Sequence, residues 1–149
     1  MNLYEVPGDL VFGSIQRSIS ELLRVSGSRG QLMGNFSDFS YIVVAQGHIS
    51  TQRDGVVVTG ILPVKERGTE TFISLVVTRK NCETDNLTSE MLRYLVNRAR
   101  GQNTSRIYYT SQSADEALED TLSRNGFVYE KSVEDSKTIE MVLHVAQGP

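Results

Sequence analysis

Side chains able to act as bases, nucleophiles or metal ligands are few in this sequence and lie far apart. His48 and His144 have no cysteine or acidic partner at the spacing of metal ligands, so a metal site has little support. Either imidazole has the chemistry of a general base, but a surface or packed histidine is the commoner case. Cys82 precedes Glu83, whose charge disfavours the thiolate, so Cys82 is not predicted to be a nucleophile.

Three glutamates border predicted strands in the middle of the chain: Glu66, Glu70 and Glu83. A carboxylate in such a position can deprotonate an amine that lies within hydrogen-bonding reach. Far more often it is a solvated charge in a turn. The acidic residues alone therefore do not define an active site.

Residues 71–101 are predicted to join a buried strand to an amphipathic helix. Residues 72–78 are largely apolar and rich in β-branched types, which is typical of a strand covered on both faces. A ligand can bind where the carboxyl end of such a strand meets the amino end of a helix. The loop between them, residues 79–86, contains no glycine. Apolar residues then recur at helical spacing, at Leu87, Met91, Leu92, Leu95, Val96 and Ala99.

The same periodicities predict the elements before this junction. We expect a short edge strand at residues 3–6 and then a helix capped by Asp9, with an apolar face made of Leu10, Ile15, Ile19, Leu22 and Leu23. A long loop at 27–40 leads to a strand at 41–45, with a continuation or a bulged edge at 46–52. A turn at 53–55 connects it to a strand at 56–64, and a second turn at 66–69 follows.

After the junction, a strand at 106–110 is predicted to run parallel to the one at 71–78, because a full helix separates the two. Its adjacent residues Tyr108 and Tyr109 point to opposite faces. Ser113 and Glu116 have the spacing of a capping box for the next helix, and Asn125-Gly126 ends it. Two final strands are expected at 127–131 and 137–145.

These elements predict the fold class α/β (α+β). The order is β-α-β-β-β-α-β-α-β-β, and the sheet is mixed, mostly antiparallel, with flanking helices. With 149 residues, the chain is expected to form a single domain, residues 1–149.

Composition limits the classes of function. The chain has 15 basic and 18 acidic residues, a net charge of -3, and no long run of either sign, so a nucleic-acid partner is not indicated. The single cysteine cannot form an internal disulfide and suits a reducing compartment. The amino terminus lacks the pattern of a signal peptide and no apolar run is long enough to span a membrane. We therefore expect a cytoplasmic protein with no membrane partner.

The carboxyl-terminal half resembles the GCN5-related N-acetyltransferase (GNAT) family. The resemblance rests on the helix that ends at residues 95–101 (LVNRARG), the strand at 106–110 (RIYYT), the helix that leads into Asn125-Gly126-Phe127, and the apolar final strand around residues 141–143. Together with the element order over residues 41–145, these motifs imply a GNAT-like fold.

One departure from the family lies in the loop that holds the pyrophosphate of an acyl-coenzyme A. In the family, an arginine and spaced glycines after the central strand let backbone amides approach the phosphates. The resemblance puts Cys82 at the arginine position, and Glu83 and Asp85 at the glycine positions. Two carboxylates there would repel a pyrophosphate, although acidic residues at a helix start also stabilise the helix dipole. Arg79 and Lys80 can supply positive charge from the side.

A second departure is Leu122, which stands where many family members have a tyrosine that protonates the leaving thiolate. Leucine cannot transfer a proton, although some active relatives lack this tyrosine. The two departures favour a catalytically degenerate GNAT-like pseudoenzyme with no catalytic residues and no cofactor. Such a protein would act through protein–protein contacts, as an assembly component or a regulator, with another protein or a second copy of the chain as its partner. Compact chains of this kind resemble those encoded by tailed phages and linked to virion assembly, which implies a location in the host cytoplasm or the virion.

The alternative is an active acyl-coenzyme A-dependent N-acyltransferase with an atypical phosphate loop, which would bind acetyl-coenzyme A. Its pantetheine arm would contact backbone groups of Leu75, Val76 and Val77, and its pyrophosphate the backbone amides of Cys82, Glu83, Asp85 and Leu87. In the family, the region of the loop at 27–40 helps frame the acceptor. In a protein without a cofactor, this loop becomes a surface for a protein partner, unless its aromatic residues only fasten it to the core.

Overall fold

A computed structural model describes residues 2–26, 36–48, 56–79, 84–111, 115–130 and 138–145. The predicted order of strands and helices is confirmed, with one change: the strand expected at residues 71–78 is divided into two short strands. The elements are β1 (Asn2–Pro7), the 3-10 turn η1 (Gly8–Leu10), α1 (Gly13–Ser26), the 3-10 turn η2 (Phe36–Asp38), β2 (Tyr41–His48), β3 (Val56–Arg67), β4 (Glu70–Ile73), β5 (Val77–Thr78), α2 (Thr84–Arg100), β6 (Arg106–Ser111), α3 (Glu116–Arg124), β7 (Val128–Tyr129) and β8 (Ile139–His144).

The described strands form one mixed sheet. Its strand order is β1-β2-β3-β4-β6-β8-β7. The short strand β5 is not part of this order and pairs with β3. The pair β4 and β6 is parallel, as predicted from the intervening helix α2, and the remaining pairs are antiparallel. A mostly antiparallel sheet with flanking helices confirms the predicted fold class.

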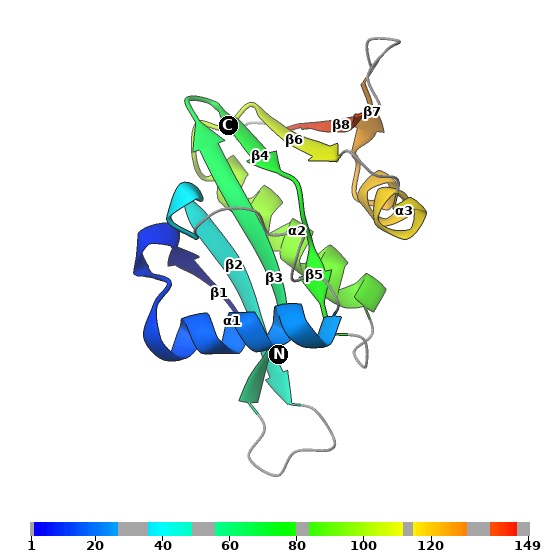
Figure 1. Cartoon of the computed structure of the whole chain (residues 1–149). Coiled ribbons are helices and arrows are strands. Elements are labelled where there is room, and N and C mark those ends of the chain that lie inside the picture. The colour runs from blue at the N-terminus through cyan, green and yellow to red at the C-terminus, as the bar shows by residue number, and fades with distance from the viewer. Residues whose placement is uncertain are drawn as a thin grey trace.

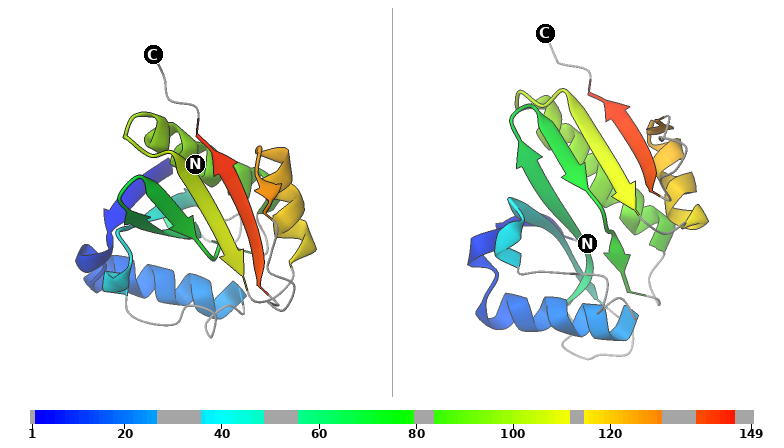
Figure 2. Two further views of the ribbon diagram at one scale, coloured as in Figure 1. Left: turned by 90° about the horizontal axis from the view of Figure 1, so that it is seen from above. Right: turned by 45° about the horizontal axis from the view of Figure 1, so that its top comes forward.

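Two apolar clusters cover the two faces of the sheet. On the face that we call the α1 side, Ile19, Leu22 and Leu23 of α1 pack against residues of β2, β3 and β5. On the opposite face, the α2 side, Leu92 and Leu95 belong to a cluster with residues of β2, β3, β4, β6 and β8. Figure 1 shows α1 in front of the sheet and α2 behind it. Figure 2 shows that α1 extends across the sheet as far as β5, so β4, β6 and β8 have no described helix over their α1 side.

The first helix begins later than the sequence suggested. Residues Gly8–Leu10 form a 3-10 turn, and α1 starts at Gly13, whose φ of 63° suits a glycine. The prediction that Asp9 caps this helix is wrong, because Asp9 lies within the 3-10 turn and its side chain is not part of a helix cap. Leu10 is likewise not on the apolar face of the helix, since 53 % of its surface is exposed.

The cap of α3 also differs from the prediction. The side chain of Asp115 accepts a hydrogen bond from the Leu118 backbone N–H at 3.1 Å, and Glu119 Oε2 accepts one from the Asp115 N–H at 2.9 Å. This reciprocal pair starts the helix at Glu116, so Asp115 and not Ser113 is the cap. The predicted end is confirmed, with Asn125 as the carboxyl cap.

Some predictions concern residues outside the described part of the chain. They are the turn at 53–55, Ser113, most of the loop that starts at residue 27, and the residues at 80–83. None of the described helices is both long and apolar enough to cross a membrane.

Candidate functional site

The division between β4 and β5 is a bulge. Lys65 pairs with Phe72, and Ile61 pairs with Val77. The first members of these pairs are four positions apart on β3, whereas the second members are five positions apart. The strand after β4 therefore carries one extra residue, which interrupts its pairing and bends it.

The bulge opens a gap between β5 and β6. The parallel ladder of β4 and β6 ends at Ile73 and Tyr109. Past that point, Thr110 and Ser111 of β6 pair on the β8 side, while β5 continues along β3. In Figure 1 the two strands diverge, with α2 behind them. Two strand edges that lack a described neighbour thus border the gap, and such edges can pair with an added chain.

The residues predicted to contact a pantetheine arm lie at this gap. Leu75 and Val76 fall in the stretch without a described strand partner. Leu75 packs against the α1-side cluster and Val76 against the α2-side cluster, so their side chains are half-buried on opposite faces. Val77 is buried in β5, opposite Ile61. The side chains of all three residues thus pack against the body of the protein, and their backbone is the part that borders the gap.

The predicted phosphate loop is placed only in part. Cys82 and Glu83 lie outside the described residues, and Asp85 is the second residue of α2. Leu87 is buried in the α2-side cluster, so its side chain does not face a ligand. The first backbone amides of a helix have no acceptor within the helix. The amino end of α2 at Thr84 is thus the described element that can face a phosphate.

A cleft of about 380 Å³ lies beside the gap on the α1 side. It is lined by Phe39, Lys65, Arg67, Phe72, Ile73, Ser74 and Thr110. Alternate residues of a strand share a face. Because Leu62 and Val64 point into the α2-side cluster, Lys65 and Arg67 are directed to the α1 side.

Sequence reasoning missed this cationic edge of the cleft. It ended the strand at residue 64 and assigned residues 66–69 to a turn, whereas β3 runs to Arg67 and the turn is Gly68 and Thr69. The available signal was the period-two pattern, since apolar residues at Leu62 and Val64 alternate with Lys65 and Arg67 on the other face.

An aromatic pair lies next to the cleft on the same face. The rings of Phe72 and Tyr108 stack with their centroids 5.4 Å apart at an angle of 15°. The Tyr108 hydroxyl accepts a hydrogen bond from Arg106 Nη1 at 3.1 Å. Tyr109 points to the opposite face and is buried in the α2-side cluster, so the prediction that these tyrosines face opposite sides is confirmed.

Three of the candidate bases named from the sequence, Glu66, Glu70 and His144, do not line the cleft. Glu66 points to the α2 side and accepts a hydrogen bond from Arg98 Nη1 at 3.2 Å. Glu70 pairs with Arg67 across the hairpin. His144 is exposed on β8, and His48 is the last residue of β2. The structure therefore does not bring these four residues together.

Glu140 of β8, which the sequence analysis did not single out, lies opposite Thr110 of β6. Burial, a hydrogen bond with Glu130 and repulsion from that carboxylate raise the pKa of Glu140 above its ordinary value. Glu140 shares the α1 side with Thr110, because cross-strand partners face the same way. It borders the open face of the sheet without being part of the cleft lining.

Arg79 is directed away from the amino end of α2. Its Nη2 lies 3.7 Å from Glu21 Oε1 of α1, and the residue is 9 % exposed. Its Nε is buried and has no hydrogen-bond partner among the described residues. The helix α2 packs on the opposite face of the sheet. The guanidinium group of Arg79, which the sequence suggested for a pyrophosphate, therefore contacts α1 instead.

Leu122, which stands where the family places a tyrosine, is completely buried in the α2-side cluster. Its burial gives this residue a packing role. None of the described residues forms a group of three or more histidine, cysteine, aspartate or glutamate side chains that could hold a metal ion.

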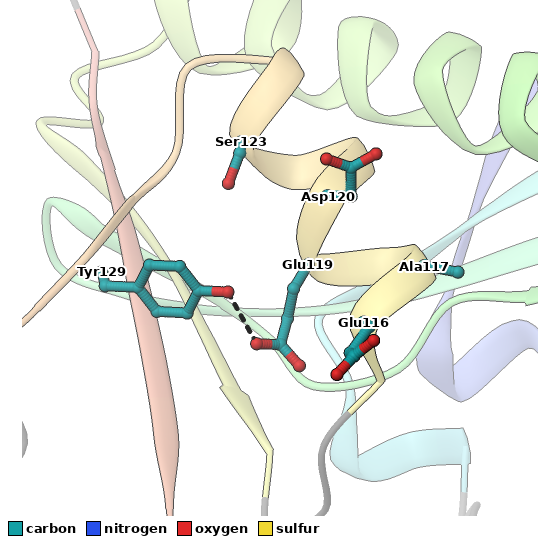
Figure 3. Close-up of a pocket in the computed structure, with 6 residues that line it drawn as sticks. All are labelled: Glu116, Ala117, Glu119, Asp120, Ser123 and Tyr129. Carbon is teal, nitrogen blue, oxygen red and sulfur yellow. Dashed lines mark hydrogen bonds between the residues drawn. The ribbon is translucent and has the colours of Figure 1, made fainter.

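A larger hollow, of about 500 Å³, lies on the outer side of α3 (Figure 3). Glu119 Oε1 accepts a hydrogen bond from the Tyr129 hydroxyl at 2.7 Å, and its other oxygen binds the Asp115 amide. Acidic side chains dominate the lining, which consists of Glu116, Ala117, Glu119, Asp120, Ser123 and Tyr129. These carboxylates disfavour an anionic ligand. We therefore regard the smaller cleft, beside the strand gap, as the candidate site.

Several solved structures share this fold. An aminoglycoside 6'-N-acetyltransferase in complex with coenzyme A has a TM-score of 0.71 at 14% sequence identity, over 100% of this chain and 99% of that one. A Desulfovibrio desulfuricans protein assigned to the GNAT family has a TM-score of 0.69 at 13% identity, over 97% and 100%. The ribosomal-protein-S18-alanine N-acetyltransferase of Escherichia coli has a TM-score of 0.65 at 8% identity, over 99% and 97%.

The chain therefore has the fold of the GNAT acetyltransferases, as the sequence resemblance implied. Identities this low establish the fold and not the activity. No protein-family model matches the sequence, and no curated protein matches it.

Proposed function

We propose that this chain is an acyl-coenzyme A-dependent N-acyltransferase whose reaction takes place at the gap between β5 and β6. The observation that carries the proposal is the separation of the two strands beyond Ile73 and Tyr109, directly beside a cleft with polar and cationic lining. A substrate in the cleft and a thioester in the gap would meet at this point.

The gap suits the pantetheine arm of coenzyme A. This arm is an extended chain with two amide groups, and a strand edge without a neighbour can bind such groups as it binds an added strand. The edge is offered by the backbone of Leu75, Val76 and Val77, while their side chains pack into the two clusters. We assign the pyrophosphate to the amino end of α2, where the backbone amides of Asp85 and Leu87, with Cys82 and Glu83 before them, are the candidate donors.

Coenzyme A supplies an acyl group activated as a thioester. The contribution of the protein is to hold the acceptor amine in the cleft beside that carbonyl carbon, which accelerates the transfer by proximity and orientation.

A degenerate protein that works through protein contacts is the second candidate. Two observations favour it: Leu122 is a core residue rather than a proton donor, and carboxylates occupy positions 83 and 85. Val128 and Tyr129 on the edge strand β7 are 56% and 60% exposed and offer apolar surface to a partner. Under this candidate, the partner is a second copy or another protein, in the cytoplasm or in a phage particle.

Titration with acetyl-coenzyme A separates the two candidates. The enzyme is expected to bind with a micromolar dissociation constant in calorimetry and to melt at a higher temperature as ligand is added. The absence of binding at millimolar ligand would remove the first candidate. Light scattering after size exclusion would then test for self-association.

Two matched substitutions test the location of the site. Ser74→Trp places a bulky side chain at the mouth of the gap and is expected to weaken acetyl-coenzyme A binding at least tenfold. Ser123→Trp places the same side chain in the acidic hollow on α3 and should leave binding unchanged. The two variants are matched because both serines are exposed. The opposite result would move the site to α3.

A further inference from the structure

We infer that the acceptor of this proposed acyltransferase is an amine that also carries a carboxylate, such as an amino acid or a peptide acid, and that Lys65 and Arg67 select it. The inference rests on the proposed function, because it names the acceptor class of the same site. It depends on the charges of the cleft, on their freedom from protein partners, and on the shape of the surrounding wall.

The cleft has two cations and no carboxylate in its lining. Lys65 and Arg67 are two residues apart on β3 and share the α1 side. Between them, Glu66 points to the other face, where it binds Arg98. The alternation of the strand thus places both positive charges in the cleft and removes the intervening negative charge from it.

Neither cation forms an ion pair within the described part of the protein. Among the described residues, no carboxylate oxygen lies within 4.0 Å of either cationic group. Glu70 pairs with Arg67 in the hairpin, but its other neighbour in the sheet is Arg106, whose charge it also faces. Two cations that have no ion-pair partner attract an anionic group of the substrate, and guanidinium binds a carboxylate through two parallel hydrogen bonds.

The remaining walls determine the size and polarity of the acceptor. Phe39 of the segment after η2 and Phe72 of β4 provide apolar surface, and Ser74 and Thr110 provide hydroxyl groups beside the gap. A volume of about 380 Å³ holds a molecule of amino-acid to short-peptide size. An amine whose carboxylate binds Lys65 and Arg67 lies close to the gap, because Lys65 is the direct partner of Phe72 and the gap opens immediately after Ile73.

The same charges favour the reactive form of the amine. Nearby cations stabilise the neutral amine relative to the ammonium ion, and only the neutral form has a free electron pair. The amine nitrogen forms a bond to the thioester carbonyl carbon, the carbon–sulfur bond breaks, and the proton lost by the nitrogen ends on the coenzyme A sulfur. The products are an amide and free coenzyme A.

This cleft disfavours the acceptors named for some structures of the same fold. Aminoglycosides carry several ammonium groups, and two cations in the cleft repel them. This chain and the aminoglycoside acetyltransferase of similar structure share 14% identity, so a common backbone does not require a common acceptor.

The test compares acceptors that differ only in charge. With acetyl-coenzyme A at saturation, release of free thiol is measured for the α-amino acids and their glycyl dipeptides, for the corresponding C-terminal amides, and for spermidine and kanamycin. We expect kcat/KM for the best acid to exceed that for its amide at least tenfold, and spermidine and kanamycin to react more slowly than either.

Substitutions assign this preference to the two cations. The double variant Lys65→Gln with Arg67→Gln should lose most of the preference for acids while its affinity for acetyl-coenzyme A, measured by calorimetry, stays the same. Arg93→Gln is the matched control, since Arg93 is an exposed cation of α2 outside the cleft and should keep the full preference. Charge reversal to Lys65→Glu should shift the preference toward the amides.

Each other outcome overturns the inference. Equal or faster turnover of amides or polyamines would refute it, and so would a double variant that retains the preference. If acetyl-coenzyme A binds and no carboxylate-bearing amine reacts, the acceptor class is wrong while the cofactor assignment stands. If acetyl-coenzyme A does not bind, the proposed function fails and the inference falls with it.

Discussion

The guanidinium carbon of Arg98 lies 3.9 Å from the centre of the Tyr41 ring. The same side chain donates from Nε to Glu5 at 2.7 Å and from Nη1 to Glu66 at 3.2 Å. Arg98 therefore joins α2 to strands β1, β2 and β3, although Glu5 and Arg98 are far apart in the chain. The sequence assigned this arginine only to the carboxyl end of a helix, where a cation interacts favourably with the helix dipole.

Replacement of Arg98 by alanine is expected to destabilise the protein. The change removes a cation–π contact and two charge-assisted hydrogen bonds from a side chain that is only 22% exposed, and leaves Glu66 without this partner. We expect a loss of about 2 kcal/mol in the free energy of unfolding, measured by urea denaturation. Arg93→Ala is the control, since Arg93 is 62% exposed in a single pair within α2 and should cost less than about 0.5 kcal/mol. Equal losses in the two variants would contradict the assigned role.

Gly8→Ala is expected to disturb the contact that positions Phe39 at the cleft. A Cβ atom at Gly8 would collide with the backbone carbonyl oxygens of Phe36 and Phe39. Backbone atoms move less readily than side chains, so we expect a loss of about 2–3 kcal/mol. Gly47→Ala meets only the Thr59 side chain, at an ordinary contact distance of 3.5 Å, and alanine suits a strand better than glycine does, so this variant should be neutral or more stable by up to about 1 kcal/mol. Thermal melts of both variants give the comparison, and a neutral Gly8→Ala would show that η1 and η2 lie farther apart.

Stability is expected to fall above about pH 10. Burial is the largest cause of the raised pKa of Tyr4, Tyr41, Tyr94 and Tyr109, and the hydrogen bond to Glu119 is the largest cause at Tyr129. In the unfolded chain these groups lose their protons near 10.0, the ordinary value, while the folded protein still holds them. Their stabilising contribution is complete below that pH and is lost as the pH rises through the folded values.

The alkaline transition has a direct measurement. Urea midpoints between pH 8 and pH 11.5, with tyrosinate absorbance recorded in parallel, should show unfolding coupled to ionisation. Phenylalanine cannot ionise, so Tyr41→Phe should flatten part of the pH dependence of the urea midpoint. A curve that is the same in this variant would exclude Tyr41 as a contributor.

Glu130→Gln is expected to stabilise the protein at neutral pH. Burial raises the pKa of Glu140 most, and the hydrogen bond and charge of Glu130 raise it further. Because the folded pKa is raised, the associated stability is complete below the ordinary value and is lost as the pH rises. Solvent screens this pair, so removal of the neighbouring charge should add only about 0.3 kcal/mol or less at pH 7 and nothing at pH 4. Urea denaturation at the two pH values checks this, and an equal gain at both would point to a cause other than charge.

Much of the fold follows from local patterns. The face made by Ile19, Leu22 and Leu23 and the apolar stripe of α2 are read directly from a period of 3.6 residues, and the parallel pair β4 and β6 follows from the helix between them. Errors arose where a contact between distant segments overrides a local signal. Asp9 has the type of a helix cap, but the chain first turns at Gly8 to meet the backbone of Phe36 and Phe39, and the helix starts only at Gly13.

The candidate site was predictable only in part. The sequence placed a ligand after the strand at 71–78 and named Leu75, Val76 and Val77, which do border the gap. The bulge itself has no clear local signature, because the run at 72–78 has the composition of an unbroken strand. It becomes visible only through the register with β3, where one extra residue separates the two pairs.

The sequence by itself determined the element order, the two apolar faces and the class of fold, because these depend on periodicities within single segments. Only the tertiary structure decided where the sheet opens and what surrounds the opening. Lys65, Phe72 and Thr110 belong to three different strands, and they meet because strand register aligns them. Register depends on hydrogen bonds between distant segments, so the charge of the cleft could be recognised only in the folded chain.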